Sequence, residues 1–307
     1  MDTFIQQIIN GLVLGSIYAL VALGYTMVYG ILGLINFAHG EVVMIGALTA
    51  LTVIKLLADS GLPGTVVVLI GLLAAVPVCM ALGFTIERIA YRPLRNAPRL
   101  APLITAIGVS IVLQQLAMIF WGRNYHAFPP ILPTSSREIG GAHITDVQIV
   151  IILLAVAIMA GLMLLVNRTR LGRAMRATAE NPQIAGLMGV NINVIISATF
   201  LIGSALAAVA GVMVSANYSI AHYHMGFILG LKAFTAAVLG GIGNLPGAML
   251  GGVLLGLIES LGAGYIGDLT GGFLGSHYQD IFAFVVLIVV LMFKPSGLFG
   301  EKTGDRA

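Results

Sequence analysis

NRTRLGRAMRATAENPQIAGLMGVNIN, residues 167–193, is a charged and amphipathic stretch that lies between two long apolar runs. Four arginines open it, and a carboxylate, an Asn-Pro pair and a short apolar pattern follow. The flanking runs, 147–167 and 194–216, are each long enough to cross a bilayer as a helix of about 20 residues. The stretch itself is too polar to lie in lipid and too patterned for a simple tether. It therefore predicts a membrane protein with a structured segment exposed between two of its helices.

The composition excludes an ordinary soluble domain. Of the 307 residues, 59% are hydrophobic and only 9% are charged, and the mean hydropathy is +1.03. Soluble domains carry charge on about a quarter of their residues. Membrane β-barrels are built from short segments of alternating hydrophobicity, whereas the apolar runs here are continuous. The expected fold class is therefore an all-α polytopic membrane protein.

The apolar runs predict about eight or nine helical segments within a single transmembrane domain that spans residues 1–307. They lie at 5–30, 36–58, 64–90, 102–121, 147–167, 194–216, 229–241, 247–265 and 281–293. The loops 88–99 and 168–176 each contain four arginines, which predicts that both are cytoplasmic, because basic residues collect on that side of a membrane. Counting crossings from these loops places the N-terminus outside and the C-terminus in the cytoplasm.

The region 229–265 is expected to form a hairpin whose tip is GGIGNLPG, residues 240–247. Its first arm, 229–241, is shorter than the roughly 20 residues of a full crossing, so we expect a broken or re-entrant helix. Discontinuous helices beside a substrate site recur in transporters. Gly240, Gly241 and Gly243 are therefore candidates for the substrate pathway.

A second candidate for the pathway is the polar group Asn36, His39 and Glu41, which interrupts an apolar run. A carboxylate at membrane depth is costly and usually faces a cavity or a partner. The charge pattern of the loops, however, predicts that this run begins near the cytoplasmic surface. There the three residues would cap or pair at a helix start, where a carboxylate is favoured by the helix dipole. The sequence leaves both interpretations open.

Several other polar side chains lie singly in or beside the apolar segments. Lys232 is expected to extend its ammonium group to the membrane interface. Glu259 is expected to pair with a neighbouring helix or to line a cavity. His222 and His224 fall in a loop that the sidedness places outside, where a solvated surface is the expected environment.

The sequence contains no pattern for catalysis, for a metal site or for nucleotide binding. The tip 240–247 is not followed by the Lys-Ser/Thr of a phosphate loop, and it misses the dinucleotide-binding glycine spacing. Cys79 is the single cysteine, so disulfides and cysteine-based metal clusters are excluded. The net charge of +3 reflects the two arginine loops and does not indicate a nucleic-acid partner. We expect no catalytic residue, no metal and no cofactor in this chain.

Three blocks in order along the chain carry a resemblance to a known family. They read INFAHGEVVMIGA at 35–47, ENPQIAGLMGVN at 180–191 and KAFTAAVLGGIGNLPGAMLGG at 232–252. The chain resembles the permeases of the high-affinity branched-chain amino acid ABC importers, and in particular the shorter permease subunit of the pair. The likeness covers essentially the whole chain, and it implies a type II-like ABC importer permease in a bacterial inner membrane.

The resemblance also implies partners and an energy source. A homologous second permease would complete a heterodimer within the lipid, two cytoplasmic ABC ATPases would bind beneath it and consume ATP, and a periplasmic amino-acid-binding protein would deliver the substrate. The pathway would carry leucine, isoleucine and valine. Related permeases carry urea or short amides, which stays open as an alternative.

The coupling segment of the family maps onto residues 168–193, which would transmit motion from the ATPases. Its matching residues here are Arg173, Arg176, Glu180, Asn181, Pro182, Ala185, Gly186 and Gly189. The residues themselves agree with this role, because Asn181 can cap a helix whose first residue is Pro182. An apolar face would follow at Ile184, Leu187 and Met188, as suits a helix that docks into a groove.

An autonomous channel or an ion-coupled carrier is the alternative from another class. Such a protein needs a charged relay or a buried ion site within the membrane, and it has no use for a docking segment at 167–193.

Overall fold

The structure is a computed structural model that describes residues 2–95, 97–98, 100–129, 135–271 and 279–300. The predicted cytoplasmic tail beyond residue 300 and Arg99 of the first arginine loop lie outside these residues. The described helices are α1 (Asp2–Leu32), α2 (His39–Leu56), α3 (Gly64–Ile86), α4 (Leu100–Trp121), α5 (Asp146–Arg168), α6 (Arg170–Glu180), α7 (Pro182–Leu187), α8 (Ile192–Tyr218), α9 (Met225–Gly240), α10 (Leu245–Leu269) and α11 (Gln279–Phe293).

The predicted fold class is confirmed, because the described part of the chain is dominated by apolar helices. Seven helices are long and apolar enough to cross a membrane, and α9 and α11 contain two shorter apolar segments. The helix α3 continues without a break through a π-helical turn at Glu87–Tyr91 and a 3-10 turn at Arg92–Leu94. The amphipathic helices α6 and α7 are short and separate from the membrane-spanning set.

Central and peripheral helices differ in the fraction of their residues that is buried. In the apolar windows of α1 and α8, 72% and 61% of the residues are buried, against 28% in α3, α4 and α5. The central helices α1 and α10 pack backbone to backbone, since a Cβ added at Gly15 would lie 2.7 Å from the Cα of Val253. Small residues permit such close approach, which drives association where lipid offers no hydrophobic effect between helices. The peripheral helices leave apolar faces for lipid or another subunit.

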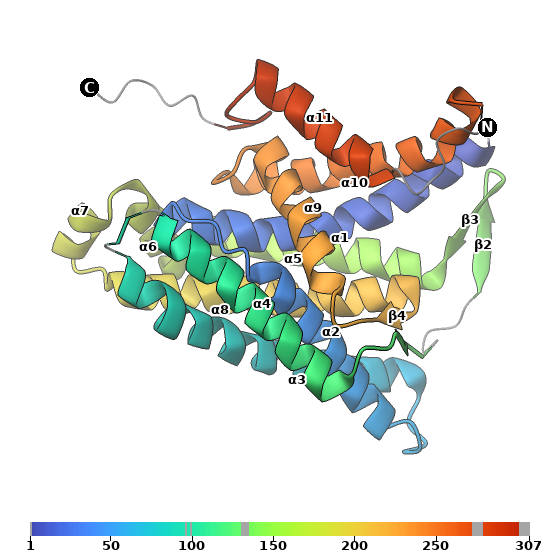
Figure 1. Ribbon diagram of the computed structural model, residues 1–307, viewed down its shortest axis with the longest axis horizontal. Helices are drawn as coiled ribbons and strands as arrows, with labels where there is room; N and C mark the ends of the chain where they lie inside the picture. The colour runs from blue at the N-terminus through green and yellow to red at the C-terminus, as the bar shows by residue number, and fades with distance from the viewer. Residues whose placement is uncertain (1, 96, 99, 130–134, 272–278, 301–307) are drawn as a thin grey trace.

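Two helices begin inside the bundle and cross only part of it (Figure 1). The helix α1 ends beside α6 and α7, and the chain 33–38 then returns inward before α2 begins. After α8 reaches the opposite end, the chain 222–224 returns inward in the same way, and α9 runs back toward the α7 end. The short first arm of the predicted hairpin is thus confirmed as α9, and α2 is a second interrupted helix.

Short strands cover the end of the molecule opposite α7 (Figure 1). The pair β1 (His126–Ala127) and β4 (Ile220–Ala221) is antiparallel, as is the pair β2 (Ser136–Ile139) and β3 (Ala142–Thr145). Thr145 ends β3 and caps α5 in a reciprocal capping box with Gln148. The sequence pattern does not predict these strands, because they are too short to show alternation.

Candidate functional site

The helix α6 is fixed against the end of α5 by its first turns. Thr169 caps it by accepting a hydrogen bond from the backbone N–H of Gly172 at 3.0 Å. The guanidinium of Arg176 donates to the carbonyl of Val166, one of the last carbonyls of α5. Cationic groups are favoured at a helix C-terminus, so this contact also suits the helix dipole. Met175 is buried, which holds one face of α6 on the bundle.

The helix α7 is defined by a cap at each end, as the sequence predicts at its start. The side chain of Asn181 accepts from the backbone N–H groups of Gln183 and Ile184, at 3.0 and 3.1 Å, and Pro182 is the first helical residue. Gly189 ends the helix with φ of +87°, a left-handed conformation that favours glycine. The whole turn therefore has a fixed shape outside the membrane-spanning helices.

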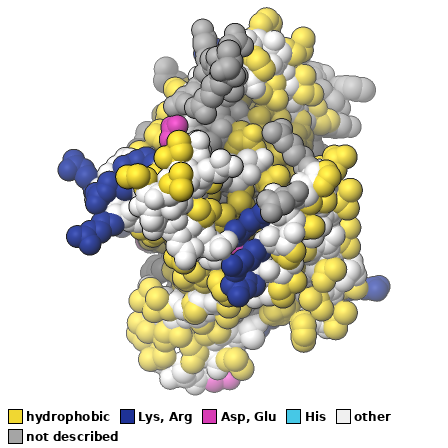
Figure 2. All heavy atoms as spheres, turned by 90° about the vertical axis from the view of Figure 1, so that its left-hand side faces the viewer, with side chains coloured by type: hydrophobic (Ala, Val, Ile, Leu, Met, Phe, Trp, Pro, Cys, Tyr) yellow, Lys and Arg dark blue, Asp and Glu magenta, His cyan; other side chains and the backbone are white. Residues whose placement is uncertain are grey.

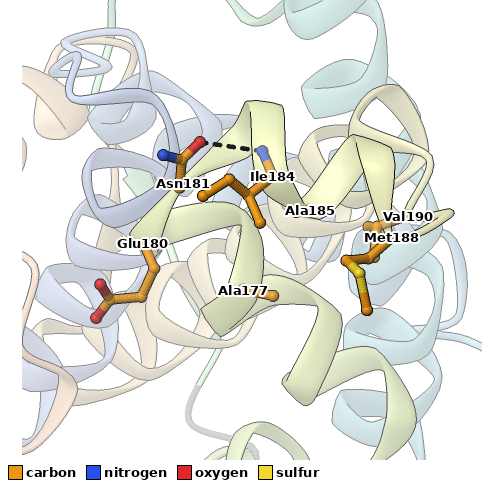
Figure 3. A pocket seen from close by; sticks show the side chains of 7 residues that line it. All are labelled: Ala177, Glu180, Asn181, Ile184, Ala185, Met188 and Val190. Carbon is orange, nitrogen blue, oxygen red and sulfur yellow. Dashed lines mark hydrogen bonds between the residues drawn. The ribbon is translucent and has the colours of Figure 1, made fainter.

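The apolar residues of α7 are exposed and not buried in the bundle. The exposed fractions are 58% for Ile184, 87% for Leu187 and 80% for Met188, whereas Ala185 faces inward at 3%. Figure 3 shows the hollow beside this face, with Ile184, Met188 and Ala177 around it; its volume is about 460 Å³. An exposed apolar face on a capped helix is typical of a surface that binds a partner.

The first arginine loop is joined to the start of α8 at this end of the molecule. Arg95 pairs with the buried carboxylate of Glu87 and donates to the side chain of Asn193 at 2.6 Å. Ser197 of α8 donates to the other oxygen of Glu87 at 2.8 Å. Figure 2 shows Lys and Arg side chains gathered on this face beside hydrophobic atoms. Because α8 follows α7 directly, these contacts connect the exposed segment to the membrane helices.

The structure brings the predicted coupling residues together on this surface, which we call the α6–α7 surface (residues 170–190). Of the predicted coupling residues, Ala185 is buried, and the exposed ones are Arg173, Arg176, Glu180, Asn181, Pro182, Gly186 and Gly189. Their role in coupling stays a prediction.

The starts of the two interrupted helices touch each other in the interior. A Cβ at Gly40 of α2 would overlap the carbonyl of Gly226 of α9, and it would lie 2.9 Å from the Cα of Gly230. The N-terminal ends of α2 and α9 therefore pack backbone to backbone. Helix starts within a membrane protein concentrate positive dipole ends and unpaired N–H groups, which is the usual architecture near a transporter's substrate.

Glu41 lies at this junction with an exposed fraction of 0%. Its Oε1 accepts hydrogen bonds from Gln114 at 2.7 Å and from Ser110 at 3.0 Å, both on α4. Its Oε2 has no hydrogen-bond partner, and Glu41 is in none of the ion pairs among the described residues. The carboxylate thus connects α2 to α4 and faces the first turn of α9 at Gly226.

Asn36 and His39 are also buried, with exposed fractions of 3% and 2%. Asn36 accepts from the Ala38 backbone N–H and from the Tyr91 hydroxyl, each at 3.2 Å, and so shapes the turn before α2. The His39 ring packs edge-on to Tyr25 at 4.9 Å. These residues therefore pair and pack inside the bundle, as one of the two interpretations allowed, and they do not lie on its exposed surface. The chain 33–38 carries them into the bundle first, and a substrate contact by any of them stays a prediction.

A cavity of about 480 Å³ lies beside this junction, between α4 and α9. Its lining combines apolar side chains with a few polar ones: Tyr25, Phe37, Ile107, Ser110, Ile111, Gln114, His224, Phe227 and Leu231. Ser110 and Gln114 are the two side chains that donate to Glu41. Sequence reasoning did not predict this cavity, because α4 has no charged residue and because the lining residues come from separate parts of the chain.

The glycines of the hairpin tip have a different location. A Cβ at Gly241 would overlap the backbone of Gly300, and Gly241 itself has φ of +104°. The Phe299 backbone N–H donates to the carbonyl of Gly240 at 3.1 Å, and Asn244 donates to the Phe299 carbonyl at 3.0 Å. Gly243, with φ of +96°, completes the turn. The tip is thus packed against the C-terminal segment, and a pathway role for Gly240, Gly241 and Gly243 stays a prediction.

Membrane-crossing helices around a buried polar junction, with a capped amphipathic segment at one end, define a polytopic membrane permease. The family described as "Branched-chain amino acid transport system / permease component" matches residues 7–291. The chain belongs to this family, whose members are transport permeases and not enzymes.

Similar proteins cover almost the whole chain. It is 49% identical to the high-affinity branched-chain amino acid transport system permease protein BraD of Pseudomonas aeruginosa, over 99% of this chain and 98% of that protein. It is 45% identical to the permease protein LivH of the same kind of system in Escherichia coli K12, over 99% and 97%. The solved structure of PsaBC from Streptococcus pneumoniae in complex with Fab aligns over 96% of this chain and 91% of that one, with 14% identity and a TM-score of 0.45.

Proposed function

We propose that this chain forms half of the translocation pathway of an ATP-driven importer for leucine, isoleucine and valine. A homologous permease would form the other half, two cytoplasmic ABC ATPases would hydrolyse the ATP, and a periplasmic binding protein would deliver the amino acid. The family and the names of the relatives BraD and LivH support this substrate class. In this proposal the chain binds no cofactor of its own.

The observation that carries the proposal is the exposed apolar face of α7 on the basic end of the molecule. Leu187 is 87% exposed and Met188 is 80% exposed, on a helix that both of its caps hold in shape. Exposed apolar side chains of this kind have nothing to pack against within the described chain, and a groove on a soluble partner would bury them. A channel or carrier that works alone has no need of such a face.

The same surface supports an orientation for the chain. Basic residues collect on the cytoplasmic side, and the α6–α7 surface lies on the arginine-rich end. The helix α1 begins at the opposite end (Figure 1), so the N-terminus would be periplasmic. The segment 296–300 packs on the hairpin tip toward the α7 end, which supports a cytoplasmic location for this segment.

The test uses Leu187→Glu in the complete transporter, reconstituted in proteoliposomes with its ATPases and binding protein. Gln183→Glu is the matched control, because it adds the same charge to an exposed residue of the same helix. We expect Leu187→Glu to abolish leucine uptake and leucine-stimulated ATP hydrolysis while the membrane subunits still assemble. Uptake equal to that of Gln183→Glu would overturn the docking role of α7. Absence of leucine uptake in the unmodified transporter would contradict leucine as its substrate.

A further inference from the structure

The cavity between α4 and α9 has a polar wall whose donors are already used toward Glu41. Ser110 has one hydroxyl proton, and it donates that proton to Glu41 Oε1 at 3.0 Å. Gln114 donates from its amide nitrogen to the same oxygen at 2.7 Å, which leaves its carbonyl oxygen unused by that bond. The wall therefore presents oxygen acceptors to the cavity, with a buried carboxylate directly behind them. Such a wall attracts a group that donates several hydrogen bonds and carries positive charge.

The incompletely compensated charge of Glu41 favours a cationic ligand at this wall. It is fully buried, its Oε2 has no hydrogen-bond partner, and it is in none of the ion pairs among the described residues. A buried carboxylate is costly unless a positive charge or several donors compensate for it. The N-terminal ends of α2 and α9 supply part of that compensation. A bound cation next to Ser110 and Gln114 would supply more.

Apart from Tyr25 and His224, the remainder of the cavity lining is apolar, and the cavity is large enough for a small amino acid. Ile107 and Ile111 line it from α4, and Phe227 and Leu231 line it from α9. Its volume of about 480 Å³ falls within the roughly 300–1,000 Å³ range of small-molecule sites. The lining thus contains an acceptor wall and a larger apolar wall, which matches a ligand with a charged donor group and a branched hydrocarbon chain.

We propose that this cavity is the substrate site of the permease, in which the ammonium group of a branched-chain amino acid contacts Ser110 and Gln114 and its side chain lies between α4 and α9. The proposal rests on the proposed function and deepens it by naming the contact residues. Urea and short amides carry no cation, so the same wall would discriminate against them. The carboxylate of Glu41 acts through Ser110 and Gln114, and it is a positioning residue for them.

The first test measures protection of a cysteine placed in the cavity. Ile111→Cys is made in the Cys79→Ser background, and the complete nucleotide-free transporter is treated with a small thiol reagent. Leucine and its decarboxylated analogue isoamylamine are expected to slow the labelling, whereas the deaminated analogue isocaproate is not. Ile119→Cys, on an exposed turn of the same helix outside the cavity, is the control and should label equally in all conditions. Equal labelling of Ile111→Cys with and without leucine would overturn the proposal.

The second test removes the Gln114 side-chain amide, and with it both the proposed acceptor and the hydrogen bond to Glu41. Gln114→Leu keeps the side-chain size but loses the acceptor, and Gln115→Leu is the matched control on the neighbouring exposed residue. Since a hydrogen bond to a charged group is involved, about tenfold more leucine should be needed to protect Ile111→Cys. Protection unchanged from that of Gln115→Leu would contradict the contact. If Gln114→Leu does not assemble, the cysteine protection alone decides. Leucine uptake by the unmodified transporter separates a failure of this site from a failure of the proposed function.

Discussion

The ammonium group of Lys232 lies 2.5 Å from Oε1 of Glu259 inside the helix bundle, so a residue of α9 forms an ion pair with α10. The same nitrogen is 2.6 Å from Oδ1 of Asp280 at the start of α11. The hydroxyl of Tyr18 on α1 donates to Oε2 of Glu259 at 2.9 Å. One lysine thus connects α9 to two helices, and through Glu259 to a third. The expectation that Lys232 reaches the membrane interface is wrong, because only 7% of it is exposed.

Removing this lysine is expected to destabilise the permease strongly. Lys232→Met would leave Glu259 buried without its cation, which costs about 3–5 kcal/mol when one partner of a buried pair is lost. The double variant Lys232→Met with Glu259→Met should recover most of that loss, since no buried charge is then left at the pair. Thermal unfolding of the purified permease complex in detergent measures both.

The control for the lysine prediction is Lys55→Met, which removes an exposed lysine at the end of α2. It should unfold at nearly the temperature of the unmodified protein. A double variant no more stable than Lys232→Met alone would show that the ion pair does not account for the loss.

The contact between α2 and α9 predicts opposite effects for two glycine substitutions. Gly40→Ala would force its Cβ into the carbonyl of Gly226, and overpacking of this kind costs about 1–3 kcal/mol. Gly108→Ala, on α4, meets nothing within 4 Å and should stabilise its helix by roughly 0.5–1 kcal/mol. Thermal unfolding should therefore shift down for the first and slightly up for the second. Shifts of the same sign would contradict the packing at this junction.

The cap of α7 predicts a coupling defect without loss of the membrane fold. Asn181→Ala removes the acceptor for two backbone N–H groups, which costs about 1 kcal/mol in a helix of only six residues. Leucine-stimulated ATP hydrolysis in proteoliposomes should fall severalfold, and Asn181→Asp should keep it.

Asn191 provides the matched control for that cap. It accepts from the backbone N–H of Val194 at 3.3 Å and begins α8, a helix of 27 residues that packing holds in place. Asn191→Ala should leave ATP hydrolysis nearly unchanged. An equal loss in both variants would indicate a general effect on the loop and not on α7.

The loop before α9 predicts a local dependence on pH. Partial burial, and then the proximity of His224, lower the pKa of His222 below its usual value of 6.5. The ring stacks on Tyr125 with centroids 4.2 Å apart, and its Nδ1 accepts from the His224 backbone N–H, which requires that nitrogen to be unprotonated. A lowered pKa means that the folded loop binds protons less readily than the unfolded chain. The contribution of His222 to the stability of the folded loop is therefore complete above about pH 6.5, and it falls as the pH drops below that value.

Hydrogen exchange of the His224 amide tests this sign. Protection at pH 5.5 should be lower than at pH 7.5 after correction for intrinsic exchange rates. His222→Phe keeps the stacking and removes the titration, so its protection should differ little between the two conditions. A wild-type amide equally protected at both values would contradict the expectation.

Much of the architecture could be predicted from the sequence because it depends on local composition. Continuous apolar runs predict a helical membrane protein, and the two arginine loops predict which end of it is basic. Asn181 and Pro182 predict the start of α7 because a cap and a first-turn proline act within four residues of chain. The short arm 229–241 predicted an interrupted helix, and it is α9. Each inference uses residues that are neighbours in sequence.

The interior was decided only by the tertiary structure. Hydropathy evaluates each helix by itself, whereas a buried polar group depends on which helices pack around it. Glu41 finds Ser110 and Gln114 on α4, and Lys232 finds Glu259, across separations that no local pattern encodes. Within the bundle these buried charged side chains depend on partners from other helices. The sequence therefore determined a membrane permease with an exposed amphipathic segment, and the packing of α2, α4 and α9 decided where its polar cavity lies.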